Sequence, residues 1–277
     1  MMDNEAKAQK LKGEGNSHFV KGDYARAEGI YSQALVLDPH LASLYTNRAI
    51  CRFHLANYDG VIADCDACLA LDPKSVKGHY FKSKALLEQG ADPDAACAAA
   101  LRAYEACRAR DDKSLDMTMA HLLRCRHERW GHRERHRRRE AADLEREVLD
   151  LLRRETDRDV ADVAEGDDVE RSAVREEGDR KIEAMRGIFE RARKDDDRKR
   201  EVPEWLVDDI SFNVMVDPVI THTGRSYERA SIQAAINNNA IDPVTREPLA
   251  KGELVPNIVL KQACEWFLED NGWAYDW

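Results

Sequence analysis

The stretch ISFNVMVDPVITHTGRSYERASI (Ile210–Ile232) decides how the C-terminal part of this 277-residue chain is interpreted. A short apolar run is broken by the turn-forming pairs Asp217-Pro218 and Thr223-Gly224, and a helical pattern begins near Ser226. This order predicts a hairpin followed by a helix. The stretch holds no evident nucleophile, metal-ligand set or phosphate-binding loop, so its purpose has to come from the surrounding sequence.

The chain continues with AINNNAIDPVTREPLAKGELVPNIVLKQACEWFLEDNGW, which repeats the alternation of turns and helices. We expect a helix at Tyr227–Asn237, a turn-rich loop at Asp242–Leu249 and a final helix opened by Pro256-Asn257. Two loops therefore bracket one helix in a small α+β module at 203–277.

This layout resembles the U-box, a domain with the shape of a RING finger but without its metal ions. The resemblance rests on the segments DPVIT, DPVTREPL and LVPN. A RING finger needs about eight Cys and His ligands for two zinc ions, whereas 203–277 contains only Cys264 and His222. We expect neither metal nor cofactor, and loops held by hydrogen bonds and ion pairs, for which the candidates are Asp217, Arg225, Glu228, Asp242, Thr245 and Asn257.

The resemblance to the U-box implies a docking surface and no catalytic residue. In that family the reactive thioester belongs to a ubiquitin-conjugating enzyme, which the U-box positions. Ile210, Phe212 and Pro243 match the family's exposed docking residues. Arg246 matches the basic residue that donates hydrogen bonds to both conjugating enzyme and ubiquitin. The alternatives are core positions for Ile210 and Phe212, and a structural ion pair for Arg246.

The N-terminal part of the chain repeats with a period of 34 residues. Tyr24 recurs as Tyr58, and the motif LDP at Leu37–Pro39 recurs at Leu71–Pro73. Small side chains recur at the same spacing, which lets paired helices approach closely; one set is Gly15, Ala49 and Ser83. The pattern resembles the tetratricopeptide repeat, TPR, in three copies over 7–110, which implies an α-solenoid with a concave groove.

The first helix of each pair lines that groove and carries Lys12 and Asn16, then Asn47, then Lys77. Lys12 and Asn16 are four residues apart, so they share a helix face. Two lysines and two amides can receive a pair of carboxylates, although any one of them alone is more typical of a solvated helix surface. Together they resemble the dicarboxylate clamp of chaperone-binding TPR domains. The resemblance implies binding of the C-terminal Glu-Glu-Val-Asp tail of 70-kDa and 90-kDa heat-shock chaperones.

Two further residues belong to this candidate clamp. The fifth residue of the family's clamp, commonly an arginine, falls at Phe81, where a ring removes one donor and provides an apolar wall. Asp116, just after the third repeat, is the candidate for holding the peptide backbone.

The middle of the chain, 111–202, is predicted to be an extended helix followed by a charged helical hairpin or coiled coil. No proline lies between Pro93 and Pro203, so continuous helix is permitted. Gly166 marks a turn between two apolar stripes, which we expect to pair with a second copy of the chain. The alternative is an isolated, ion-paired helix. The stripes comprise Leu144, Val148, Leu151 and Leu152, then Ile182, Met185, Ile188, Phe189 and Ala192.

The cysteines indicate a reducing compartment. Seven are present, an odd number, and the N-terminal segment is polar and lacks an apolar signal core. Cys65-x-x-Cys68 has no second pair nearby, so small core thiols are a better account than a zinc or redox site. In the third repeat, Cys107 replaces the proline and Asp92 the tyrosine. A cytosolic or nuclear location is the default expectation.

The bulk composition excludes two classes of function. The net charge of -10 disfavours a general nucleic-acid binder, and no apolar run approaches the ~18 residues of a membrane span. The basic segment RERHRRRE has acidic neighbours and no interleaved aromatics, so a solvated helix face is the better interpretation. We expect no nucleic-acid or membrane partner.

Taken together, TPR repeats, a charged helical middle and a U-box resemble the chaperone-associated TPR/U-box ubiquitin-protein ligases over nearly the whole chain. The segments YTNRA, SVK, RW and EDNGW add to the match. The resemblance implies a mainly α fold and an E3 ubiquitin ligase that acts as a homodimer. It would receive misfolded clients from chaperones at its groove and ubiquitin from a conjugating enzyme at its U-box. The alternative is a non-enzymatic chaperone adaptor whose U-box is only structural.

Overall fold

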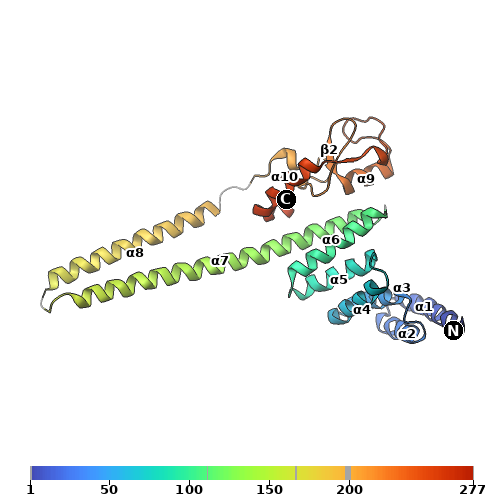
Figure 1. Ribbon diagram of the computed structural model, residues 1–277, viewed down its shortest axis with the longest axis horizontal. Coiled ribbons are helices and arrows are strands. Elements are labelled where there is room, and N and C mark those ends of the chain that lie inside the picture. Colours follow the sequence, from blue (N-terminus) through green and yellow to red (C-terminus); the bar gives the residue numbers. More distant parts are fainter. Residues whose placement is uncertain (1, 111, 166, 197–200, 277) are drawn as a thin grey trace. The chain divides into compact units, whose positions relative to one another are not determined.

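The computed structural model describes residues 2–110, 112–165, 167–196 and 201–276, and most of them are helical (Figure 1). The contacts divide the chain into two compact units. One unit combines Met1–Gly131 with Pro203–Trp277, and the other is His132–Val202. The mainly α fold class predicted from the sequence is confirmed.

Six helices form three consecutive pairs at the N-terminus. The second helices of the first two pairs begin at Tyr24 and Tyr58, which are 34 residues apart as the sequence predicts. Each helix packs against the next one along the chain, so the pairs stack as TPRs do. The helices are α1 (Met2–Val20), α2 (Tyr24–Leu37), α3 (Ala42–His54), α4 (Tyr58–Leu71), α5 (Val76–Gln89) and α6 (Pro93–Ala109).

Small side chains set the spacing between the paired helices. A Cβ atom added at Gly15 on α1 would lie 2.5 Å from the ring of Tyr31 on α2, so no larger residue fits without a shift. Ala49, one repeat later, is fully buried. Ser83, one further repeat on, donates a hydrogen bond of 2.7 Å to the carbonyl of Ala96 on α6. The predicted close approach is therefore confirmed, with a hydrogen bond added in the third pair.

Helix ends follow the turn residues of each repeat. Asp23 and Asn57 accept hydrogen bonds at the starts of α2 and α4, which both end just before an LDP proline. In the third repeat the cap has moved to Asp92, which takes the place of the tyrosine. Because Cys107 replaces the proline, α6 continues to Ala109 and has 17 residues where α2 and α4 have 14.

The charged middle forms two long helices, α7 (Leu115–Asp162) and α8 (Asp168–Asp196). Within the His132–Val202 unit, the second half of α7 runs beside α8 as a helical hairpin (Figure 1). Thr156 packs against Gly178, where a Cβ would collide with its side chain. The predicted turn residue Gly166 lies outside the described residues.

One buried apolar residue of this hairpin was missing from the predicted stripes. Leu149, absent from the predicted stripe, is buried together with Ile182 of α8. Leu144, Leu151 and Ile188 of the predicted stripes are 55%, 57% and 50% exposed in the single chain, so their pairing with a second copy stays a prediction. Several apolar residues of α7 fit a helical spacing equally well. The spacing alone therefore did not identify which of them face α8.

The C-terminal module is built around a three-stranded antiparallel sheet in the order β2-β1-β3. Val219 of β1 lies opposite Tyr227 of β2 and Pro256 of β3. Val219 and Tyr227 belong to the core of the module, which also contains Ile232 and Leu249. The elements are η1 (Glu204–Leu206), β1 (Pro218–Ile220), β2 (Ser226–Glu228), α9 (Arg229–Asn238), η2 (Lys251–Glu253), β3 (Val255–Pro256), α10 (Ile258–Asp270) and η3 (Gly272–Asp276).

One predicted helix boundary in this module is wrong. We expected helix from Tyr227, but Ser226–Glu228 pairs with β1 and α9 begins at Arg229. The burial of Tyr227 explains the difference. Its ring packs in the core of the module from a position on strand β2.

Within the described residues, none of the helices is long and apolar enough to cross a membrane. In the same residues no group of three or more His, Cys, Asp or Glu side chains is arranged to hold a metal ion. The seven cysteines are free and buried. Burial raises the pKa of the Cys65 thiol to about 12 and also raises the pKa of the Cys68 thiol, so both sulfurs of this pair are poor nucleophiles.

Candidate functional sites: a polar groove and two docking loops

The first candidate site lies on α1 and α3, where two amide side chains meet. Asn16 Oδ1 accepts hydrogen bonds from the Tyr31 hydroxyl at 2.7 Å and from Asn47 Nδ2 at 3.2 Å. Lys12, one turn before Asn16, donates to Ser43 Oγ on α3 at 2.8 Å. With its oxygen occupied, Asn16 can offer only its amide N–H groups to a ligand. This arrangement suits a carboxylate.

The remaining groove residues lie on α5 and α7. Lys77 is exposed at the start of α5, and Phe81 follows one turn later. The Phe81 ring is half-buried and makes an edge contact with Phe53, with ring centroids 6.0 Å apart. Its role as an apolar wall for a bound peptide stays a prediction. Asp116 is exposed in the first turn of α7. A direct hydrogen bond thus joins Asn16 and Asn47. No such contact links Lys77, Phe81 and Asp116 to them in the described structure, and only their positions on the helices agree with the predicted clamp.

The second candidate site consists of two loops of the C-terminal module that share one construction. In each, an aspartate N–H donates to the carbonyl five residues later, at 2.9 Å for Asp208 and 2.8 Å for Asp242. The carbonyl of each aspartate accepts a 2.9 Å bond from the N–H four residues later, at Phe212 and Arg246. Both fourth residues have positive φ, 58° and 62°, which is uncommon outside glycine. Two predicted docking residues therefore occupy equivalent positions.

The aspartate side chains hold the loop turns from inside. Asp208 Oδ2 accepts hydrogen bonds from the N–H and the hydroxyl of Ser211, both at 2.8 Å. Asp242 Oδ1 accepts the N–H groups of Val244 at 2.9 Å and Thr245 at 3.0 Å. Both carboxylates belong to fully buried residues. Hydrogen bonds therefore organise each loop, as predicted for Asp242, whereas Asp208 was missed by sequence reasoning.

Strand β2 connects the two loops through adjacent residues. The Tyr227 hydroxyl donates to Asp242 Oδ1 at 2.8 Å, and the Glu228 N–H donates to Asp208 Oδ1 at 2.9 Å. Burial alone would raise the pKa of Asp242, but hydrogen bonds from the backbone and from Tyr227 outweigh it and hold that pKa below its usual range. The carboxylate thus stays charged and keeps accepting these bonds.

Three other residues predicted to hold the loops also make ion pairs or hydrogen bonds. Arg225 pairs with Asp209 at 3.2 Å, and Asp217 accepts a 2.8 Å hydrogen bond from Arg229 Nε. Thr245 Oγ1 accepts the N–H of Glu247 at 3.4 Å. The prediction that ion pairs and hydrogen bonds hold this module is confirmed for these residues.

Exposure separates the four predicted docking residues. Phe212 is 70% exposed, which contradicts the core alternative for this residue. Pro243 and Arg246 are exposed, and Arg246 makes no ion pair with any residue in the described part of the chain. Ile210 is half-buried against the module's core, so for it both the core and the docking interpretation hold in part.

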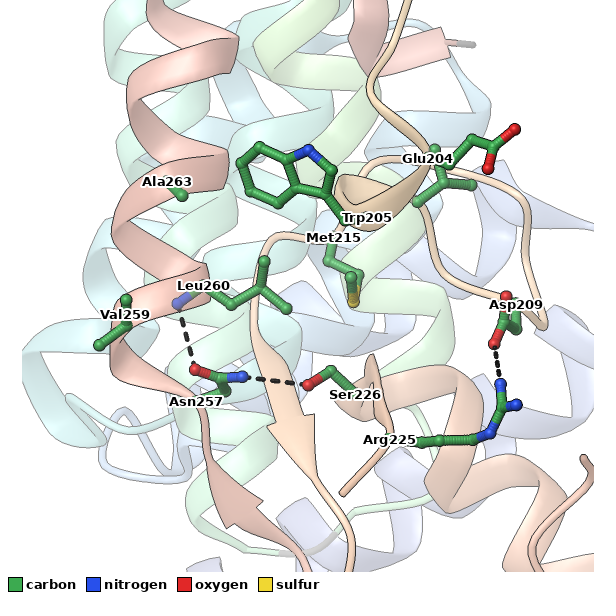
Figure 2. A pocket seen from close by; sticks show the side chains of 11 residues that line it. Glu204, Trp205, Asp209, Met215, Arg225, Ser226, Asn257, Val259, Leu260 and Ala263 are labelled. Carbon is green, nitrogen blue, oxygen red and sulfur yellow. Dashed lines mark hydrogen bonds and ion pairs between the residues drawn. The ribbon is translucent and has the colours of Figure 1, made fainter. Parts of the chain in front are cut away.

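A shallow hollow of about 490 Å³ lies on the module between η1, β2 and α10 (Figure 2). Asn257 links its two sides, accepting the N–H of Leu260 at 3.1 Å and donating to Ser226 Oγ at 3.0 Å. Trp205 and Val259 border it and are 62% and 78% exposed. Asn257 therefore acts as the cap that joins α10 to the sheet, as expected.

Comparison with known families identifies the module. The sequence model of the U-box domain matches residues 202–273. These residues are a U-box domain. The two aspartate-anchored loops with Phe212 and Arg246 are therefore U-box loops, and the sequence-based prediction of this domain is confirmed.

Similarity to a curated relative covers almost the entire chain. The chain is 29% identical over 273 residues to "E3 ubiquitin-protein ligase CHIP" of Arabidopsis thaliana, which covers 98% of this chain and 96% of the relative. A 72-residue segment, 26% of this chain and 22% of the relative, is 44% identical to "Stress-induced-phosphoprotein 1" of Caenorhabditis elegans. The predicted resemblance to chaperone-associated TPR/U-box ligases is confirmed by the first of these matches.

Two solved structures show partial similarity. The "First TPR of Spaghetti (RPAP3) bound to HSP90 peptide SRMEEVD" is 28% identical, covers 37% of this chain and 80% of that one, and has a TM-score of 0.36. The "TPR2B-domain:pHsp70-complex of yeast Sti1" is 23% identical, covers 43% of this chain and 96% of that one, and has a TM-score of 0.42.

Proposed function

We propose that this protein is an E3 ubiquitin-protein ligase and co-chaperone. Its TPR groove binds the C-terminal Glu-Glu-Val-Asp tail of 70-kDa and 90-kDa heat-shock chaperones, and its U-box docks a ubiquitin-conjugating enzyme that transfers ubiquitin to chaperone-bound misfolded clients. The observation that carries the proposal is the similarity to a CHIP ligase along 98% of the chain, in a molecule whose U-box loops expose Phe212, Pro243 and Arg246.

The ligase half of the proposal follows from the chemistry of the loops. The U-box supplies no nucleophile, because the thioester belongs to the conjugating enzyme, so its contribution is to bind and orient. Phe212 offers an exposed ring to an apolar partner surface, and Pro243 a rigid apolar contact on the other loop. No residue in the described part of the chain occupies the guanidinium donors of Arg246, so they can bind carbonyl groups of enzyme and ubiquitin.

The chaperone half rests on the groove. Lys12 and Lys77 supply positive charge, and the amides of Asn16 and Asn47 supply oriented donors beside them. A terminal aspartate carries two carboxylates close together, which such a set can bind at once. Phe81 then contacts the apolar residue before the terminus, and Asp116 accepts a backbone N–H of the tail.

The assembly state and location belong to the same proposal. Leu144, Leu151 and Ile188 leave apolar surface on the outside of the hairpin, which a second copy of the chain covers in a homodimer. Seven free, buried cysteines suit the reducing cytoplasm, with the nucleus as a second compartment.

Separation of function tests the proposal. With purified activating enzyme, conjugating enzyme and ubiquitin, Phe212→Ala should remove all ubiquitin transfer, including transfer to the ligase itself. Lys77→Ala should keep self-modification but lose modification of a chaperone and its bound client. Gel analysis of both reactions reads out the result. If Phe212→Ala and wild type are equally active, the docking role fails; if wild type is inactive with a panel of conjugating enzymes, the adaptor alternative holds.

A further inference from the structure

A third lysine lies on the groove face of α5. Lys77, Phe81 and Lys84 are spaced at four and seven residues, which places all three on one side of the helix. Sequence reasoning considered the first two only, because the spacing of the known clamp ends there. Seven residues correspond to about 10 Å along a helix axis. Lys84 is therefore separated from the clamp lysine by about two helical turns.

Aromatic rings surround the Lys84 ammonium group. Its Nζ atom is 4.6 Å from the ring centroid of Phe53, 5.6 Å from that of Tyr80 and 5.8 Å from that of Phe81. Ring faces attract a cation and hold a long side chain in place. The half-buried lysine is thereby pre-positioned at the groove, so that less rotamer freedom is lost when it binds a ligand.

No carboxylate neutralises this cation in the described part of the chain. The residue one turn further along its own helix, Glu88, pairs with Arg124 of α7 at 3.3 Å. The packed neighbour on α7 is His121, whose ring is 4.9 Å from that of Tyr80. Burial, with the charges of Lys84 and Arg124, lowers the pKa of His121 to about 4, so this ring is neutral near pH 7. The groove end keeps the uncompensated positive charge of Lys84.

We propose that Lys84 forms a second carboxylate-binding subsite, which receives the first glutamate of a bound Glu-Glu-Val-Asp tail. An extended peptide advances about 3.3 Å per residue, so about 10 Å corresponds to three residues. That glutamate is the third residue before the terminal aspartate held at the clamp. The proposal rests on the chaperone-binding function above and makes Lys84 a residue that selects acidic tails.

A double-mutant cycle in calorimetry tests this subsite. Full-length wild type and Lys84→Gln are each titrated with SRMEEVD and with SRMQEVD, in which the first glutamate is neutral, and with SRMEQVD, in which the second one is. Lys84→Gln should weaken SRMEEVD and SRMEQVD binding about fivefold, as for a partly exposed ion pair. It should leave SRMQEVD binding unchanged, and Lys84→Arg should retain the preference for acid.

Lys82→Gln is the matched control, because it removes the same charge from the same helix. Lys82 already pairs with Asp66 of α4, so its loss should affect all three peptides alike and weakly. An equal effect of Lys84→Gln on all three peptides, or an effect that follows the second glutamate, overturns the subsite. Amidated SRMEEVD separates the two proposals: if wild type binds it as tightly as the free acid, the clamp itself is wrong.

Discussion

Glu228 makes the stability of the U-box depend on pH in an unusual direction. Its Oε2 atom accepts the N–H groups of Val216 at 2.7 Å and Asp217 at 2.9 Å, while Oε1 has no hydrogen-bond partner in the described structure. Burial raises the pKa of Glu228 to about 7, because it outweighs the two hydrogen bonds, which lower the pKa; the nearby charges of Asp217 and Asp208 add to the rise. The folded U-box therefore holds a proton on Glu228 that the unfolded chain releases.

The size of the effect follows from the two pKa values of Glu228. Between 4.5, the ordinary value, and about 7, each pH unit is worth about 1.4 kcal/mol, which gives about 3 kcal/mol in total. Because the folded state binds more protons in this window, stability falls as the pH rises from about 4.5 to 7 and levels off above. An ordinary paired carboxylate would show the opposite slope.

Hydrogen exchange of the Val216 and Asp217 amides measures this effect directly. We expect Glu228→Gln, which keeps an accepting oxygen and cannot ionise, to match wild type at pH 4 and to raise the opening free energy by up to about 3 kcal/mol at pH 8. Comparing variants at one pH cancels the intrinsic exchange rate. Glu265→Gln, an exposed site on α10, serves as the control. Equal protection of wild type and Glu228→Gln at pH 8 refutes the reasoning.

Three further predictions concern other parts of the chain. Asp64 is 2% exposed and pairs with Arg48 at 2.6 Å, so Asp64→Ala should lower the free energy of unfolding, measured by urea titration, by about 3 kcal/mol. The control Asp66→Ala removes a half-exposed ion pair and should lower it by under about 1 kcal/mol. Gly15→Val should lower the melting temperature, since its side chain would overlap the Tyr31 ring; an unchanged melting curve would show that α1 can shift freely. Leu149→Asp should unfold the hairpin helices, seen as lost circular dichroism signal, while Leu151→Asp should keep the helices and reduce only the mass of the assembly in light scattering.

The TPR part of the fold was predictable because each repeat solves the same packing problem. Small residues 34 positions apart lie at equivalent points of successive helix pairs. The contact between Gly15 and Tyr31 shows why a small residue is required there. The hydrogen bond between Asn16 and Asn47 agrees with their predicted positions on neighbouring first helices, while the clamp itself stays a prediction. The hydrogen bond from Tyr31 to Asn16 was not predicted, since no local pattern shows that the Tyr31 hydroxyl crosses to α1.

The inner face of the hairpin and the residues around Lys84 were not predictable in this way. Leu149 and Leu151 are both apolar and lie two residues apart, so either can belong to the stripe, and only the partner helix decides. Lys84 gains its surroundings from Phe53 on another helix. Interactions between helices far apart in the sequence have no period to reveal them.

Asp208 was the missed residue that the sequence could most easily have revealed, and its position explains how hydrogen bonds hold the first U-box loop. Asp208 and Phe212 have the same spacing as Asp242 and Arg246, a signal that a comparison of the two loops would have found. In each loop a buried carboxylate gathers N–H groups of its own turn, and a donor from β2 fixes that carboxylate in turn. Since the two β2 residues are neighbours in one strand, the distance between the loops is set by the backbone itself. We therefore expect Phe212 and Arg246 to meet one partner surface with a fixed separation, which is the condition for positioning the proposed thioester without touching it chemically.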